Sequence, residues 1–278
     1  MSEIIDAHTH IFPDDLVDRA MEALHEAYQA EPVRRPTVSG LLEEMAASGV
    51  SRSVVAPVST KASQVRGIND WAISLRGPRL IPFCTLHPHC EGLEEEIERV
   101  IAAGIRGVKL QPFFQGYDFE DRRAREMFEM ISGRLVVLMH GGQEIVDIPN
   151  VIPAPEPLAR LKRDFAELQI VVAHLGGYNM WDEVEEHLVG EDVYFDLSYT
   201  FDRAPDKLIR RIGDRHGWER IVFASDFPWQ SQREALDGLM RLGLPDDTLA
   251  GVLSGNLRGL LGLDGQSDVP EETTRIGR

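Results

Sequence analysis

The chain has 278 residues, 43% hydrophobic and 27% charged, which is ordinary for a globular protein and fits one large α/β barrel or two average domains. Its 46 acidic residues outnumber 29 lysines and arginines, and the resulting formal charge of −17 repels phosphate backbones, which argues against nucleic-acid partners. No apolar run approaches the roughly 18 residues of a membrane span, and the first residues lack the features of a signal peptide. The two cysteines, Cys84 and Cys90, give no disulfide framework. We therefore expect a cytoplasmic protein that acts on a small molecule, with no nucleic-acid or membrane partner; homo-oligomerisation stays open.

Short apolar and β-branched runs alternate with helical patterns along the chain. Between the runs, segments such as 38–49 place apolar residues on one helical face and end at a glycine, here Gly49. Nearly continuous apolar strands are typical of a parallel sheet that is covered on both faces. The pattern predicts an α/β fold, a (β/α)8 TIM barrel, with eight strands at residues 4–8, 53–58, 80–86, 107–112, 135–140, 170–174, 193–198 and 221–226.

Three segments depart from this alternation, so we expect a distorted barrel. Residues 12–36 are long enough for an extra helix after the first strand, which we expect to cover the barrel mouth. Residues 142–157 are rich in proline and predict a long loop above the fifth strand. The barrel is expected to span residues 1–263, followed by a disordered polar tail at 264–278.

Residues that bind metals recur where the predicted strands end. His8 and His10 are separated by one residue, so in a strand their side chains point to the same face. A lone His-x-His pair is a weak signal, but the carboxyl ends of barrel strands meet at one face of the fold, where active sites lie. The residues of this kind at the ends of the first, fourth, fifth, sixth and eighth strands are His8, His10, Lys109, His140, His174 and Asp226.

The sequence resembles the amidohydrolase superfamily. The resemblance runs from about residue 3 to 263 and rests on "DAHTHIFP", "GVKLQP", "MHGG", "VVAHLGG", "FDLS", "FASDFPW" and "SGNLRGLLGL". It is closest to the amidohydrolase-related branch that includes carboxymuconate-semialdehyde decarboxylase. The resemblance implies one or two divalent ions, with zinc as the first expectation, bound by His8, His10, His140 and Asp226.

Two residues keep alternative roles. The resemblance implies that His174 either binds a second metal or acts on the substrate. Lys109 as an ammonium cannot bind a metal; a neutral Lys109 can add carbon dioxide and bridge two ions as a carbamate, or the lysine serves as a charge near an anionic substrate. Packing roles compete as well, since His140 and His174 can be satisfied core histidines and Asp226 can cap a helix.

Other residues are assigned by their position in the pattern. Phe113, Phe114, Tyr178 and Trp229 follow strand ends and are expected to line the substrate pocket, although packing explains each at least as well. His87 and His89 form a second His-x-His, but Pro88 disrupts strand geometry between them, so we expect both outside the metal site. The remaining histidines, which lie in charged helical stretches and are expected in solvent, are His25, His187 and His216.

Three functions fit these residues. The first is a metal-dependent hydrolase of an amide, ester or lactone, in which Asp226 takes a proton from a metal-bound water and His174 assists. The second is a non-oxidative decarboxylase or hydratase of a conjugated or aromatic acid. No arginine follows a strand end to bind a carboxylate, which favours hydrolysis slightly. The third is a barrel that binds metal without turnover.

Overall fold

The computed structural model describes residues 3–28, 31–144 and 153–263. Within these ranges no helix combines the length and apolar character needed to cross a membrane. Residues 145–152 of the predicted proline-rich loop and the predicted tail at 264–278 lie outside the described residues.

All strands of the structure run parallel, in two hydrogen-bonded sheets of order β1-β2-β3 and β4-β5-β6-β7-β8-β9. They match the eight predicted strands, with the predicted strand 80–86 divided at Phe83. Phe83 N donates to Val55 O of the first sheet at 2.9 Å, whereas Cys84 pairs with Val108 of the second, so this strand changes partner. The strands are β1 (Ile5–Thr9), β2 (Arg52–Val55), β3 (Leu80–Pro82), β4 (Cys84–Thr85), β5 (Gly107–Leu110), β6 (Val136–Met139), β7 (Gln169–Val172), β8 (Tyr194–Asp196) and β9 (Ile221–Val222).

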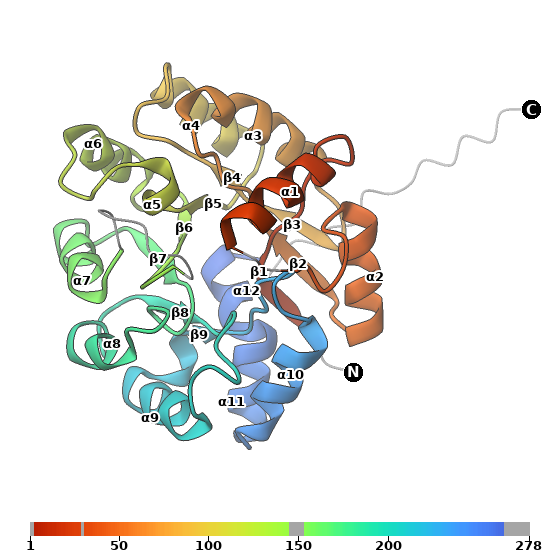
Figure 1. Cartoon of the computed structure of the whole chain (residues 1–278). Coiled ribbons are helices and arrows are strands. Elements are labelled where there is room, and N and C mark those ends of the chain that lie inside the picture. The colour runs from red at the N-terminus through yellow and green to blue at the C-terminus, as the bar shows by residue number, and fades with distance from the viewer. Residues whose placement is uncertain (1–2, 29–30, 145–152, 264–278) are drawn as a thin grey trace, which may run out of the picture.

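Figure 1 shows the strands at the centre of the molecule and the helices in a ring outside them, the arrangement of a (β/α)8 barrel. The helices are α1 (Val17–Tyr28), α2 (Val38–Ser48), α3 (Val65–Ser74), α4 (Leu93–Ala102), α5 (Pro112–Gln115), α6 (Arg122–Ile131), α7 (Pro155–Asp164), α8 (Trp181–His187), α9 (Asp206–His216), α10 (Gln232–Arg241), α11 (Asp246–Ala250) and α12 (Asn256–Leu261). Three short helical turns join them, at η1 (Ala62–Gln64), η2 (Trp218–Arg220) and η3 (Gly251–Gly255).

Local signals set the limits of these helices. Thr37 caps α2 by accepting a hydrogen bond from Gly40 N, and Gly49 ends it in the left-handed conformation at φ 79°. The predicted stop at Gly49 is therefore confirmed. The predicted extra helix after the first strand is confirmed as α1, which lies across one end of the ring of strands in Figure 1.

Side chains pack on both faces of the strands. In β6, Val136 and Leu138 join an inner cluster within the ring, whereas Val137 and Met139 join the outer core beneath the helices. This double burial explains why the strands read as continuous apolar runs. Polar side chains at the strand ends are therefore exceptions that need partners or a function.

The first and last strands meet at the end that carries the polar residues. Ala7 N donates to Phe223 O at 2.9 Å, and Asp226 N donates to His8 O at 3.0 Å. These bonds fix the end of β1 beside the segment that follows β9. They bring His8 and Asp226, which are far apart in sequence, side by side.

Candidate metal centre and substrate cavity

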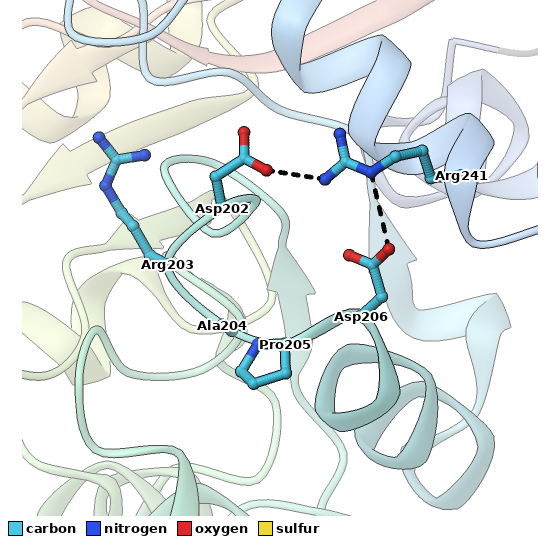
Figure 2. Close-up of a pocket in the computed structure, with 6 residues that line it drawn as sticks. All are labelled: Asp202, Arg203, Ala204, Pro205, Asp206 and Arg241. Atoms are coloured by element: carbon cyan, nitrogen blue, oxygen red, sulfur yellow. Dashed lines mark hydrogen bonds and ion pairs between the residues drawn. The ribbon is translucent and has the colours of Figure 1, made fainter.

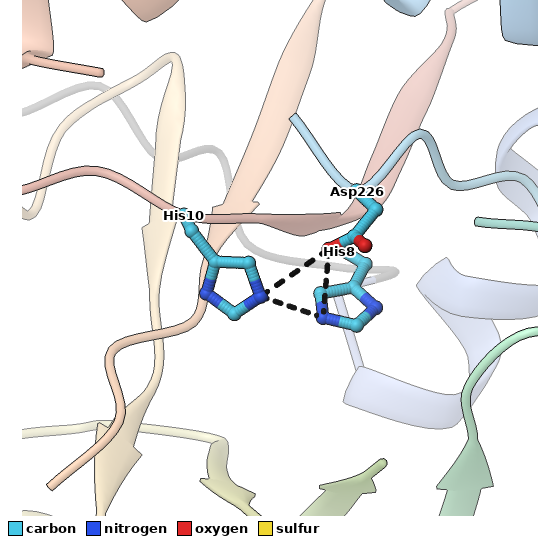
Figure 3. Close-up of side chains that lie close together, drawn as sticks. All are labelled: His8, His10 and Asp226. Atoms are coloured by element: carbon cyan, nitrogen blue, oxygen red, sulfur yellow. Dashed lines mark hydrogen bonds and ion pairs between the residues drawn. The ribbon is translucent and has the colours of Figure 1, made fainter. Parts of the chain in front are cut away.

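His8, His10 and Asp226 form a compact cluster (Figure 3). The two Nε2 atoms lie 3.0 Å apart, and Asp226 Oδ1 lies 3.6 Å from His8 Nε2 and 3.3 Å from His10 Nε2. Three ligands around a tetrahedral ion with bonds of about 2.0–2.2 Å are separated by roughly 3.3–3.6 Å. The cluster therefore has nearly the spacing that a divalent ion requires.

The other ring nitrogen of each histidine is already engaged. His8 Nδ1 lies 2.9 Å from Asp196 Oδ2, and His10 Nδ1 lies 2.7 Å from Ala56 O. Because both partners only accept hydrogen bonds, they assign the proton of each neutral ring to Nδ1 and leave both Nε2 atoms unprotonated, able to act as metal ligands. Two lone pairs and a carboxylate oxygen facing one another repel, and a cation between them removes that repulsion. The donor set thus fits a divalent metal ion.

Charges around the cluster keep the ligands in metal-binding protonation states. Burial, reinforced by the charge of Lys109, lowers the pKa of His8 to about 4, so its imidazole is neutral at neutral pH. Burial alone would raise the pKa of Asp226, but His8 and His10 outweigh it and hold the pKa below its usual value. A neutral imidazole and an ionised carboxylate are the forms that bind metal.

Buried carboxylates hold this cluster in place. Asp196 accepts from His174 N at 2.9 Å besides facing His8, and His8 lowers its pKa although burial alone would raise it. Asp6 accepts from His8 N and Ser225 N, both at 3.0 Å, and thereby ties β1 to the residue before Asp226. Burial raises the pKa of Asp6 to about 6. The position of His8 is therefore fixed by contacts with several strand ends, and not by β1 alone.

Two site residues also have strained backbones. His174 and Asp226 adopt the left-handed conformation, at φ 61° and 66°. Such a conformation is uncommon for residues other than glycine and is often found at functional sites, where surrounding contacts maintain it.

His140 and His174 form a second group beside the cluster. The rings of His8 and His174 stack with centroids 5.7 Å apart, and His174 Nε2 lies 3.2 Å from His140 Nδ1. His174 Nδ1 faces Ser198 O at 3.0 Å, which places the ring proton there and makes His174 Nε2 an acceptor from His140. His140 Nε2 then faces Glu144 Oε1 at 3.2 Å.

Glu144 has the protonation behaviour that this arrangement needs. Burial raises its pKa to about 7, and Gln111 Nε2 donates to its Oε1 at 2.8 Å. Near neutral pH, Glu144 therefore exists in both forms, and the protonated form can face the free Nε2 of His140. Two histidines, His174 and His140, therefore lie between His8 of the metal cluster and Glu144.

Lys109 is buried in the same site. Its Nζ lies 3.0 Å from His8 Nε2, and burial lowers its pKa to about 8. At neutral pH most Lys109 side chains remain charged, with an appreciable neutral fraction.

A cavity of about 970 Å³ opens above the strand ends, and all six predicted strand-end residues line it. Tyr178 and Trp229 also line it, as the sequence predicts. Of the two neighbouring phenylalanines, Phe114 lines the cavity, whereas Phe113 is buried and does not.

A smaller pocket of about 430 Å³ lies by the loop before α9 (Figure 2). Its Arg241 pairs with Asp202 at 2.9 Å and with Asp206 at 3.6 Å. The charges in this pocket neutralise one another, and it offers no buried reactive group comparable to the cluster at the strand ends.

A family model described as amidohydrolase matches residues 5–263. The chain belongs to the amidohydrolase family. Among curated proteins, none matches this sequence.

Solved structures share the fold of this amidohydrolase. The 5-carboxyvanillate decarboxylase of Sphingomonas paucimobilis is 18% identical with a TM-score of 0.73, covering 94% of this chain and 99% of its own. The 2,6-dihydroxybenzoate decarboxylase of Rhizobium is 15% identical with a TM-score of 0.73, covering 95% and 100%. A dihydroxybenzoic acid decarboxylase of Polaromonas sp. JS666, with bound manganese and 2-nitroresorcinol, is 16% identical with a TM-score of 0.73, covering 96% and 98%.

The structure of this amidohydrolase gathers the predicted ligands only in part. Within the described ranges, the group whose ligand atoms all lie within 4.8 Å contains His8, His10 and Asp226, and not His140 or His174. His87 and His89 lie outside this group, and His87 Nε2 faces Gln115 O at 3.0 Å.

Four functional candidates were missed from the sequence. Asp6 lies in the "IIDAH" strand and Asp196 in the "FDLS" run, where a carboxylate within an apolar strand was the available signal. Gln111 and Glu144 follow strand ends, but amide and loop carboxylate side chains are too common there to stand out.

Proposed function

We propose that this amidohydrolase is a metal-dependent, non-oxidative decarboxylase of an aromatic or conjugated carboxylic acid. The observation that carries the proposal is the His8, His10 and Asp226 cluster at the base of a cavity with mainly apolar and aromatic lining. Such a cavity suits a flat, conjugated molecule with one anionic end. The decarboxylases that share the fold act on aromatic acids by their names, which supports the same reaction class here.

We propose zinc as the ion, because two imidazole nitrogens and one carboxylate oxygen are common zinc ligands. Manganese is the alternative, since the Polaromonas decarboxylase holds it. A divalent ion at this cluster would bind and neutralise the carboxylate of the substrate. We propose that His140, which lines the same cavity, would be a fourth ligand of the ion.

Decarboxylation breaks the bond between carbon and the carboxylate, releases carbon dioxide, and leaves an electron pair that must take a proton. We propose that Asp226 delivers this proton to carbon after taking it from solvent, because its carboxylate lies in the cluster that faces the substrate. His174 contacts both His8 and His140 and lines the cavity, and we propose that it orients the substrate. Glu144, with a pKa near 7, holds a proton that can resupply the site.

The sequence favoured hydrolysis because no arginine follows a strand end. Lys109 supplies the missing positive charge from within the site, since its Nζ lies 3.0 Å from His8 Nε2 and its pKa of about 8 keeps most of it protonated at pH 7. An anionic substrate therefore has a cation to pair with, and this removes the objection to decarboxylation.

One observation, the position of Lys109, favours a metal-dependent hydrolase as the second candidate. The neutral fraction of Lys109 can add carbon dioxide, and its Nζ lies beside the metal cluster, 3.0 Å from His8 Nε2. A carbamate there would suit two ions, and a two-ion site suits hydrolysis.

The proposal is tested with metal-loaded protein and two panels of compounds. One contains aromatic and muconate-type acids, and the other contains lactones, esters and amides. We expect carbon dioxide to appear in proportion to the loss of an acid, with Asp237→Asn, an exposed carboxylate on α10, as an unaffected control. Turnover confined to the second panel would replace the decarboxylase with the hydrolase.

A further inference from the structure

The cavity extends well beyond the metal cluster. At about 970 Å³ it lies at the upper end of the range of roughly 300–1,000 Å³ for sites that enclose drug-sized ligands. A single-ring acid at the cluster occupies only part of it. The remainder runs outward between α1 and α3, and we call this part the α1–α3 arm.

Each helix presents one continuous face to the α1–α3 arm. On α1 and the residue before it, the lining side chains recur at spacings of three and four, from Leu16 through Ala20 to Leu24. On α3, Gly67, Ile68 and Trp71 face the arm at the same kind of spacing. Figure 1 shows α1 beside α3 at the mouth of the ring. The side chains named here are apolar, and Arg19 of α1 also lines the cavity.

Gly67 lies in the first turn of α3, one turn before Trp71. A Cβ built on Gly67 meets no heavy atom within 4 Å, and its φ is not in the positive range, so larger side chains fit without backbone strain. Glycine inside a helix costs about 1 kcal/mol relative to alanine. Packing does not require glycine here, and the absence of a side chain leaves this part of the arm open.

We propose that the α1–α3 arm binds an extended apolar part of the substrate, an alkyl chain or a second ring, whose acidic end lies at the metal cluster. This inference rests on the proposed function, because it assumes that a carboxylate binds at the metal. It makes Gly67 a determinant of substrate length. The substrate is then an amphipathic acid larger than a single substituted ring.

The test measures binding of straight-chain carboxylates, from butanoate to decanoate, to the zinc-loaded protein by calorimetry. We expect the affinity to rise roughly threefold to fourfold for each methylene group that enters the arm. In Gly67→Leu the rise should stop several carbons earlier, with butanoate affinity unchanged. Gly259→Leu is the matched control, because Gly259 also lies in a helix with open space around its Cβ but does not line the cavity.

The outcomes separate the two claims. If removing zinc weakens the binding of butanoate and of decanoate by the same factor, both the carboxylate site at the metal and the chain site in the arm are supported. If zinc has no effect while affinity still depends on chain length, the arm binds the chain and the proposed function fails. If affinity depends on chain length equally in Gly67→Leu and the wild type, the α1–α3 arm does not bind the apolar chain. Undetectable decanoate binding would refute the proposal as well. A change in self-association of Gly67→Leu by ultracentrifugation, with affinities unaltered, would make the arm an interface between copies and would also overturn it.

Discussion

His8 and His10 present their Nε2 atoms to each other at 3.0 Å, while Asp196 and the carbonyl of Ala56 hold the opposite nitrogens of the two rings. Two acceptors in such contact are stable only with a positive charge between or beside them. Lys109 supplies one to His8 in the structure, and a divalent ion would supply it to both histidines. The metal should therefore contribute to stability as well as to catalysis.

His10→Ala should lose bound metal and turnover together, because it removes one of the three clustered ligands. We expect metal affinity to fall by at least about 100-fold, measured by competition with a chelator, and the stabilisation by excess zinc to disappear from thermal melts. His187→Ala, at a partly exposed histidine of α8, is the control. Unchanged metal content in His10→Ala would place the ion elsewhere.

The same preparations give the number of ions per chain. We expect one divalent ion per chain by elemental analysis, matching the single cluster among the described residues. Two ions, together with a carbamate on Lys109 detected by mass spectrometry under carbon dioxide, would instead support the hydrolase.

Asp196→Asn should weaken metal binding without removing a ligand. An amide in place of the carboxylate can donate to His8 Nδ1, which moves the ring proton to Nε2 and blocks the metal-binding nitrogen. We expect a loss of metal affinity of about 10- to 100-fold, with Asp237→Asn as the matched exposed control. Wild-type affinity in Asp196→Asn would show that Asp196 does not select the ring tautomer of His8.

Asp226→Asn should separate metal binding from chemistry. Asparagine keeps one oxygen for the ion but cannot carry the proton, so metal should largely remain while turnover falls by roughly 100-fold or more. Single-turnover measurements at full metal occupancy test this. A loss of turnover that is only proportional to lost metal would contradict the role of Asp226 as proton carrier.

His216 should make stability depend on pH. Its ring stacks on Phe195 with centroids 3.9 Å apart, accepts from Gly190 N and faces Val193 O, and burial lowers its pKa from 6.5 to about 4. Between these pH values the unfolded chain binds more protons than the folded one, so stability is full above pH 6.5 and falls as the pH drops towards 4. The loss is on the order of 3 kcal/mol.

The measurement compares urea unfolding of metal-free wild type and His216→Gln at several pH values. Other buried histidines titrate in both proteins, so the difference between the two profiles isolates His216. Parallel profiles between pH 7 and pH 4.5 would contradict the assignment.

The sequence predicted the barrel because its strands are apolar on both faces, and it predicted His8, His10 and Asp226 because parallel strands end at one face of the fold. His216 was expected in solvent because its helix is charged, but a helix has a buried side whose phase is set by tertiary packing. Asp196 and Glu144 escaped prediction for a related reason. The role of each carboxylate depends on which histidine it contacts, and these contacts are set by how the strand ends come together rather than by local sequence.

Isotope labelling tests the central claim that the metal cluster supports decarboxylation. The metal-loaded protein is supplied with an acid from the active panel in deuterium oxide enriched in oxygen-18, and the product is analysed by mass spectrometry and NMR. Decarboxylation predicts one deuterium on the carbon that lost carbon dioxide and no oxygen-18 in the organic product. Oxygen-18 in the organic product, without release of carbon dioxide, would contradict the account.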